Sequence, residues 1–105
     1  MSELHGHLDL LALAVLAEAP AHGYAVIEEL RRRSAGAFDL PEGTVYPALH
    51  RLEASGFLRS SWETRGGRRR RVYRLTRSGR GRLERGRSDW TAFSGAVTAV
   101  VGEGR

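Results

Sequence analysis

The stretch that decides the fold runs from residue 42 to residue 76 and reads EGTVYPALHRLEASGFLRSSWETRGGRRRRVYRLT. Its first part has the i, i+4, i+7 spacing of a buried helical stripe at Val45, Leu49 and Leu52. This spacing predicts a helix that begins within residues 41–44 and ends at Gly56. Pro47 is tolerated in such a helix if Thr44 is the N-cap, because an amide in the first turn has no helical partner to lose.

The second part of the stretch predicts a β-hairpin with an arginine-rich tip. Two runs with β-favouring residues, 57–63 and 70–75, flank the segment 64–68. The Gly-Gly step in that segment supplies the positive backbone dihedrals of a tight hairpin turn. The helix and the hairpin therefore follow one another directly in the chain.

Further helices are predicted on both sides of this stretch. Residues 5–18 are apolar nearly all round, which indicates a helix that must be covered on most sides. Residues 22–34 form a second helix with an apolar stripe of Tyr24, Ile27 and Leu30. A two-helix unit thus precedes the helix and hairpin of residues 42–76.

A last helix is expected from a cap at Thr76 or Ser78 to about Val101. Its apolar positions recur at heptad-like spacing: Leu83, Gly86, Trp90, Phe93, Val97 and Val100. At 1.5 Å per residue the helix would be about 36 Å long, more than so small a body can cover. The exposed part of the stripe predicts a partner helix from a second copy of the chain.

The charge of the chain is concentrated in its second half. All 17 basic residues are arginine, and with 12 acidic residues they give a net charge of +5 over 105 residues. Residues 1–56 carry four arginines and eight acidic residues, whereas residues 57–105 carry thirteen arginines and four acidic residues. This asymmetry favours a polyanionic partner, with nucleic acid as the first candidate.

Several classes of protein are excluded or disfavoured. The chain has no cysteine, which excludes disulfides, thiolate zinc sites and cysteine nucleophiles. The histidines lack metal-ligand spacing, and no phosphate loop, serine elbow or paired-carboxylate motif is present. The apolar run 8–17 is too short for a membrane span and lacks the basic flank of a signal peptide. We therefore expect a cytoplasmic protein that is not an enzyme, with no cofactor, metal or membrane partner.

Helices followed by a basic hairpin form the outline of a winged helix-turn-helix. The expected fold is mainly α with a small β-hairpin, with residues 1–76 as the DNA-binding domain and residues 77–105 as a long C-terminal dimerisation helix. In this fold a helix enters the major groove while the hairpin reaches phosphates or the adjoining minor groove. The guanidinium fork of arginine suits bidentate contacts with phosphate.

Four motifs together resemble the PadR family of bacterial transcriptional regulators: HGY at 22–24, EGTVYPALHRLE at 42–53, GFL at 56–58 and GGRRRRVYRLT at 66–76. The resemblance implies a homodimeric repressor that leaves its double-stranded DNA operator when a small aromatic or lipophilic effector binds. One departure is Val72, where the family usually has an aromatic residue, so any contact from such a ring is absent.

The candidate DNA-binding residues lie on the helix of residues 42–56 and on the hairpin. They are Thr44, Tyr46, Pro47, His50, Arg51, Arg68, Arg69, Arg70, Arg71 and Tyr73. The resemblance favours Tyr46 most, since its hydroxyl is expected on phosphate. Alternation along the strand turns about half of the hairpin arginines away from DNA.

A second group is expected at a dimer interface or effector pocket: Leu11, Val15, Leu83, Trp90, Phe93 and Val97. For Trp90 the sequence leaves two interpretations open, packing between subunits and a platform for a planar ligand. Two alternative functions also remain open at this point. One is a basic RNA-binding or ribosome-associated module, and the other is a protein-interaction adaptor that does not bind DNA.

Overall fold

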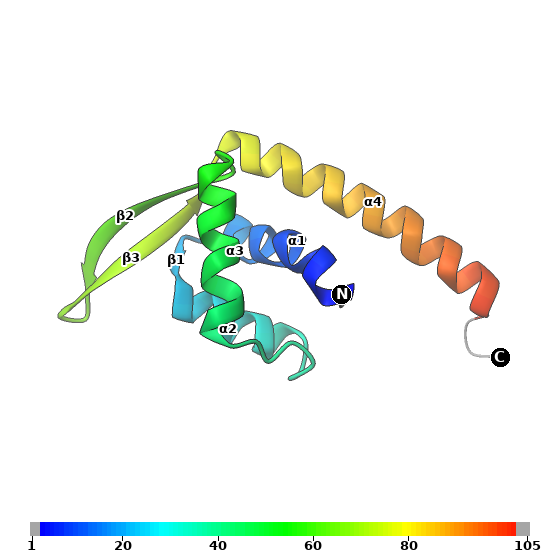
Figure 1. Ribbon diagram of the computed structural model, residues 1–105, viewed down its shortest axis with the longest axis horizontal. Helices are drawn as coiled ribbons and strands as arrows, with labels where there is room; N and C mark the ends of the chain where they lie inside the picture. Colours follow the sequence, from blue (N-terminus) through cyan, green and yellow to red (C-terminus); the bar gives the residue numbers. More distant parts are fainter. Residues whose placement is uncertain (1–2, 103–105) are drawn as a thin grey trace.

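The computed structural model describes residues 3–102 and has four helices and three strands among them (Figure 1). In chain order they are α1 (Glu3–Glu18), β1 (Ala21–His22), α2 (Gly23–Arg33), α3 (Glu42–Ala54), β2 (Leu58–Arg65), β3 (Arg68–Leu75) and α4 (Arg77–Val101). Three helices, a hairpin and a long last helix are the predicted winged helix-turn-helix, so the predicted fold is confirmed.

The core forms around α1, which packs against α2, α3, α4 and β3. Its largest fully buried side chains come from every one of these elements: Leu13, Val26, Val45, Leu49, Val72 and Leu83. The prediction that the first helix is covered on most sides is therefore confirmed. In α2 the predicted stripe was partly wrong, because Val26 is buried and Tyr24 is 49% exposed.

The hairpin of β2 and β3, called the wing below, joins its strands through Gly66 and Gly67 alone. Both glycines have positive φ, +58° and +78°, as a two-residue hairpin turn of this hand requires. The strands are therefore longer and the turn shorter than predicted. The structure also adds β1, which pairs antiparallel with β3 and completes a sheet of order β1-β3-β2.

Helix α3 begins at Glu42, within the predicted range of residues 41–44, but Thr44 is not its N-cap. The N–H groups of Thr44 and Val45 both donate to the carbonyl of Pro41, at 3.0 and 3.1 Å, and Pro41 is the N-cap. Pro47 is consequently the sixth residue of the helix and lies beyond the first turn. It is exposed, so water can reach the carbonyl that its missing N–H leaves unbonded.

Helix α4 projects from the body on the side opposite the tip of the wing (Figure 1). Thr76 caps it, as predicted, with its hydroxyl oxygen accepting from the N–H of Gly79 at 2.9 Å. The helix has 25 residues and is about 37 Å long. This projection raises the radius of gyration to 15.1 Å, compared with about 13 Å for a compact chain of this length. Within residues 3–102, no helix has both the length and the apolar character to cross a membrane.

Candidate nucleic-acid interface

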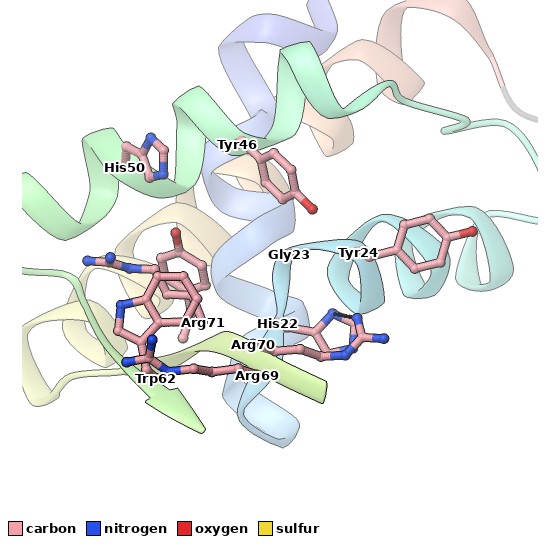
Figure 2. A pocket seen from close by; sticks show the side chains of 10 residues that line it. His22, Gly23, Tyr24, Tyr46, His50, Trp62, Arg69, Arg70 and Arg71 are labelled. Atoms are coloured by element: carbon pink, nitrogen blue, oxygen red, sulfur yellow. Dashed lines mark hydrogen bonds between the residues drawn. The ribbon is translucent and has the colours of Figure 1, made fainter. Parts of the chain in front are cut away.

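A hollow of about 290 Å³ lies between α3, the start of α2 and the wing (Figure 2). We call it the wing hollow. Its lining is aromatic and cationic: His22, Gly23, Tyr24, Tyr46, His50, Trp62, Arg69, Arg70, Arg71 and Tyr73. Six of the ten predicted DNA-binding residues are therefore brought together at one place. The other four, Thr44, Pro47, Arg51 and Arg68, lie outside it.

Tyr46 reaches from α3 toward the start of α2, as Figure 2 shows, and its ring is partly buried there. The ring lies so close to Gly23 that a Cβ on this glycine would be 1.9 Å from Cε1 of Tyr46. Burial, and then the charge of Glu42, raise the pKa of Tyr46, while Arg70 opposes them. The hydroxyl therefore stays protonated near neutral pH and can donate a hydrogen bond to an anionic oxygen.

His22 connects the start of α2 to the wing. Its Nδ1 accepts a hydrogen bond from the N–H of Ala25 at 3.3 Å, which makes it the N-cap of α2. The Nη1 atom of Arg70 lies 3.4 Å from the same nitrogen. Burial, followed by the charges of Arg70 and then Arg65, lowers the pKa of His22. The ring is therefore held neutral, as a cap that accepts at Nδ1 requires.

Four arginines of the wing form two groups according to what holds them. On one face, Arg65 and Arg74 form ion pairs with Glu63 at 3.1 and 2.7 Å, and together they lower its pKa. On the other face, the guanidinium carbons of Arg69 and Arg71 lie 4.9 and 5.7 Å from the centre of a Trp62 ring.

Three consecutive arginines keep their charge free of any carboxylate. In the described part of the chain no ion pair involves Arg68, Arg69 or Arg70. Arg71 has only a distant ion pair, 3.7 Å from Glu53. The positive charge of the wing is therefore concentrated on its β3 strand, next to the wing hollow.

The remaining predicted contacts divide by exposure. Pro47 and His50 are exposed on α3, and Arg51 is exposed but forms an ion pair with Asp9 of α1 at 2.6 Å. Thr44 is partly buried. Tyr73 is only 3% exposed and packs in the core, so its ring forms the floor of the wing hollow and is too buried for the predicted DNA contact.

The sequence-based prediction missed Trp62, His22 and Gly23 as parts of this site. A signal for Trp62 was present, because a two-residue turn at residues 66–67 places it directly opposite Arg71. The predicted five-residue tip hid that register. His22 and Gly23 belong to the site only through contacts with Arg70 and Tyr46, which are distant in the sequence.

Comparison with known proteins places the chain in a family. Residues 12–85 match the model of the transcriptional regulator PadR-like family. The chain belongs to the PadR-like family of transcriptional regulators. A PadR-like chain is a regulator and not an enzyme, so the sequence-based prediction on this point is confirmed. The family also confirms the resemblance found in the four motifs.

Relatives agree with this assignment. A transcriptional regulator of Mycobacterium tuberculosis is 45% identical over 67 residues, which cover 64% of this chain and 60% of that protein, less than two thirds of its length. Among solved structures, a PadR family transcription regulator from Clostridium difficile R20291 is 30% identical, covers 91% of this chain and 99% of its own, and has a TM-score of 0.82. A PadR family regulator from Eggerthella lenta is 33% identical, with 95% and 87% coverage and a TM-score of 0.81.

A second hollow of the PadR-like chain, about 260 Å³, lies between α1 and α4. Its lining is His7, Asp9, Leu10, Arg82, Gly86, Asp89, Trp90 and Phe93. The Trp90 ring contacts His7 edge-on, with centroids 5.1 Å apart, and lies 6.1 Å from Phe93. We call this the α1–α4 hollow.

The predicted interface group is divided by the structure. Leu83 is fully buried within the single chain, so the predicted place at a dimer interface or effector pocket was wrong for this residue. Val15 lines a different depression near Pro20, and Leu11 does not line the α1–α4 hollow either. Trp90, Phe93 and Val97 are exposed by 45%, 59% and 42%.

Proposed function

We propose that this chain is a homodimeric repressor that binds an inverted-repeat operator in duplex DNA and is released by a small aromatic or lipophilic effector. Membership of the PadR-like family of transcriptional regulators implies DNA-binding regulation and supports this proposal. The observation that supports the mode of binding is the wing hollow, where the polar face of α3 meets Arg69 and Arg70, which form no ion pair within residues 3–102.

In the proposed complex α3 enters the major groove and the wing binds the flanking backbone. Helices of this kind read base edges from the groove, while guanidinium groups contact phosphates. His50 and Pro47 are exposed on α3 and face the groove in this arrangement. The Tyr46 hydroxyl donates to a phosphate oxygen next to Arg70. Residues 1–76 then act as the DNA-binding part and α4 as the dimerisation part.

Dimerisation is supported by the apolar side chains at the free end of α4. Trp90, Phe93, Val97 and Val100 recur at helical spacing, and Val100 is 87% exposed. A seam of this size on a monomer is unfavourable in water, and a second α4 would cover it. Two copies related by a two-fold axis would present two α3 helices to half-sites about 34–36 Å apart.

The α1–α4 hollow is the proposed effector site. It adjoins the exposed seam and is lined by the Trp90 and Phe93 rings, which offer faces for stacking. A planar ligand held there between two subunits would change the angle between them and therefore the spacing of the α3 helices. To reverse a 1:99 equilibrium between the two subunit arrangements, the ligand must bind the favoured arrangement about 5.5 kcal/mol more tightly than the other.

The test of DNA binding compares the wild type with Tyr46→Phe on the DNA upstream of the coding region. Loss of one phosphate hydrogen bond per subunit should weaken binding about threefold to tenfold per half-site. Sedimentation should show an unchanged oligomeric state. Equal affinity of both proteins would remove Tyr46 from the contacts. Equal competition by structured RNA would favour the RNA-binding module, and no binding at low salt would favour the adaptor.

A further inference from the structure

Trp62 is a large apolar side chain in an unusual position. It lies near the middle of β2 on the wing and is 54% exposed, so it contributes little to the core. The core cluster and the residues packed against it do not include it. Its neighbours are instead the guanidinium groups of Arg69 and Arg71, both within the range of a cation–π interaction.

The strand register explains why these three side chains meet. Trp62 is directly opposite Arg71, and Arg69 is the diagonal neighbour two residues earlier on the same face of β3. An aromatic ring can reach both the direct and the diagonal position across an antiparallel pair. Figure 2 shows the indole and the two guanidinium groups gathered on the wing side of the wing hollow.

The two faces of the wing therefore hold arginine in chemically different ways. Glu63 forms ion pairs with both Arg65 and Arg74 on one face and accepts N–H donors from both. The indole on the other face carries no charge and accepts no N–H bond from Arg69 or Arg71. Arg71 gives one donor, Nε, to Ser60 at 2.8 Å, and its ion pair with Glu53 is distant, at 3.7 Å. Most of the N–H donors of this pair stay available for phosphate oxygens.

We infer that Trp62 is a positioning residue for DNA binding, which holds Arg69 and Arg71 ordered at the edge of the wing hollow. The inference rests on the proposed DNA-binding function. An arginine that is already ordered loses less side-chain entropy when it contacts phosphate. The quadrupole of the indole also offsets repulsion between two cations on one strand face. Trp62 acts through the arginines and has no contact with DNA of its own.

The experiment measures binding to a short duplex of arbitrary sequence at low salt, by fluorescence anisotropy, for two variants of Trp62. Trp62→Leu keeps an apolar side chain but removes the ring, and should weaken binding about threefold to tenfold. The slope of affinity against salt should not change, because no charge is lost. Trp62→Phe keeps a ring face and should recover most of the affinity. Circular dichroism serves as the folding control.

A second background separates positioning from direct contact. When Arg69→Gln and Arg71→Gln are already present, adding Trp62→Leu should change affinity by less than about twofold. An equal loss in that background would overturn the inference, because it would mean that the indole itself contacts DNA. A wild-type protein that fails to bind any duplex would refute the proposed function, whereas equal binding by wild type and Trp62→Leu would refute only the role of Trp62.

A measurement on the free protein tests the geometry directly. A guanidinium over an indole face experiences the ring current, so the side-chain Nε–Hε signals of Arg69 and Arg71 should lie upfield in wild type. These shifts should disappear in Trp62→Leu and be retained in part in Trp62→Phe. The signal of Arg68, which does not contact the ring, is the internal control. Unshifted signals in wild type would overturn the inference.

Discussion

Replacing Gly23 with alanine tests how α2 and α3 are held at the wing hollow. The new Cβ would lie 1.9 Å from Cε1, 2.7 Å from Cδ1 and 2.9 Å from Cζ of Tyr46. Carbon atoms pack at about 3.5 Å or more, so the tyrosine ring must move by about 1.5 Å or α2 must separate from α3. Neither movement is free, because Val45 and Ala48 beside Tyr46 are buried in the core.

The expected cost follows from these distances. Forcing extra atoms into a packed site costs about 1–3 kcal/mol, and alanine returns at most about 1 kcal/mol of helix propensity. Gly23 is the first residue of α2, where this gain is smaller. The free energy of unfolding of Gly23→Ala should therefore fall by about 1–2 kcal/mol in urea titrations followed by circular dichroism. Its DNA affinity should fall as well, because the Tyr46 hydroxyl is displaced.

Two further variants test the close contact between Gly23 and Tyr46. Gly43→Ala, in the first turn of α3, has nothing within 4 Å of its new Cβ and should leave stability equal or higher. In a Tyr46→Ala background the obstructing ring is gone, so Gly23→Ala should no longer destabilise. A Gly23→Ala protein as stable as wild type, or a loss of the same size in the Tyr46→Ala background, would refute the close contact.

Three other expectations concern α2 and α4. Burial, Arg70 and Arg65 lower the pKa of His22 below its ordinary 6.5. The unfolded chain therefore protonates His22 more readily than the folded chain does. The free energy of unfolding should consequently decrease as the pH falls through 6.5. His22→Asn keeps a capping side chain and should reduce this loss in urea titrations at successive pH values. Gly95→Ala, in open space on α4, should raise helicity and add about 0.5–1 kcal/mol of stability, and a lower melting temperature would contradict this. Val97→Glu should give monomers in sedimentation velocity, whereas Ala99→Glu on the opposite side of α4 should not; a persisting Val97→Glu dimer would exclude the seam.

The sequence predicts the elements of this fold better than their ends. Apolar spacing located all four helices, and the Gly-Gly step located the wing turn. The start of α3 falls within the predicted range, but Thr44 is not its cap, and Pro47 lies beyond the first turn, where its exposed place on the helix tolerates the lost hydrogen bond. Strand β1 has two residues, which is too short to show any periodicity, and only its pairing with β3 defines it.

The candidate site was harder to predict than the fold, because it depends on contacts between residues that are distant in the sequence. The predicted group of α3 and wing residues includes Tyr46 and the arginines that line the wing hollow. The depth of each side chain was not predictable. Tyr73 follows the wing arginines on β3, and Leu83 shares the apolar stripe of α4 with the exposed Trp90, but both are buried. Gly23 is needed because of Tyr46, which lies more than twenty residues later in the chain.

The arginine composition of the wing has a consequence for how binding can be controlled. Arginine keeps its proton under all ordinary conditions, whereas lysine can lose its charge by deprotonation or acetylation. The chain has no lysine side chain at all, so neither route can change the field of the wing. A pH dependence of DNA affinity would thus originate elsewhere, for example at His22, whose Nδ1 lies 3.4 Å from Arg70. Amine-directed labels would likewise leave the wing unmodified, so the protein can be tagged for binding assays without altering the surface under study.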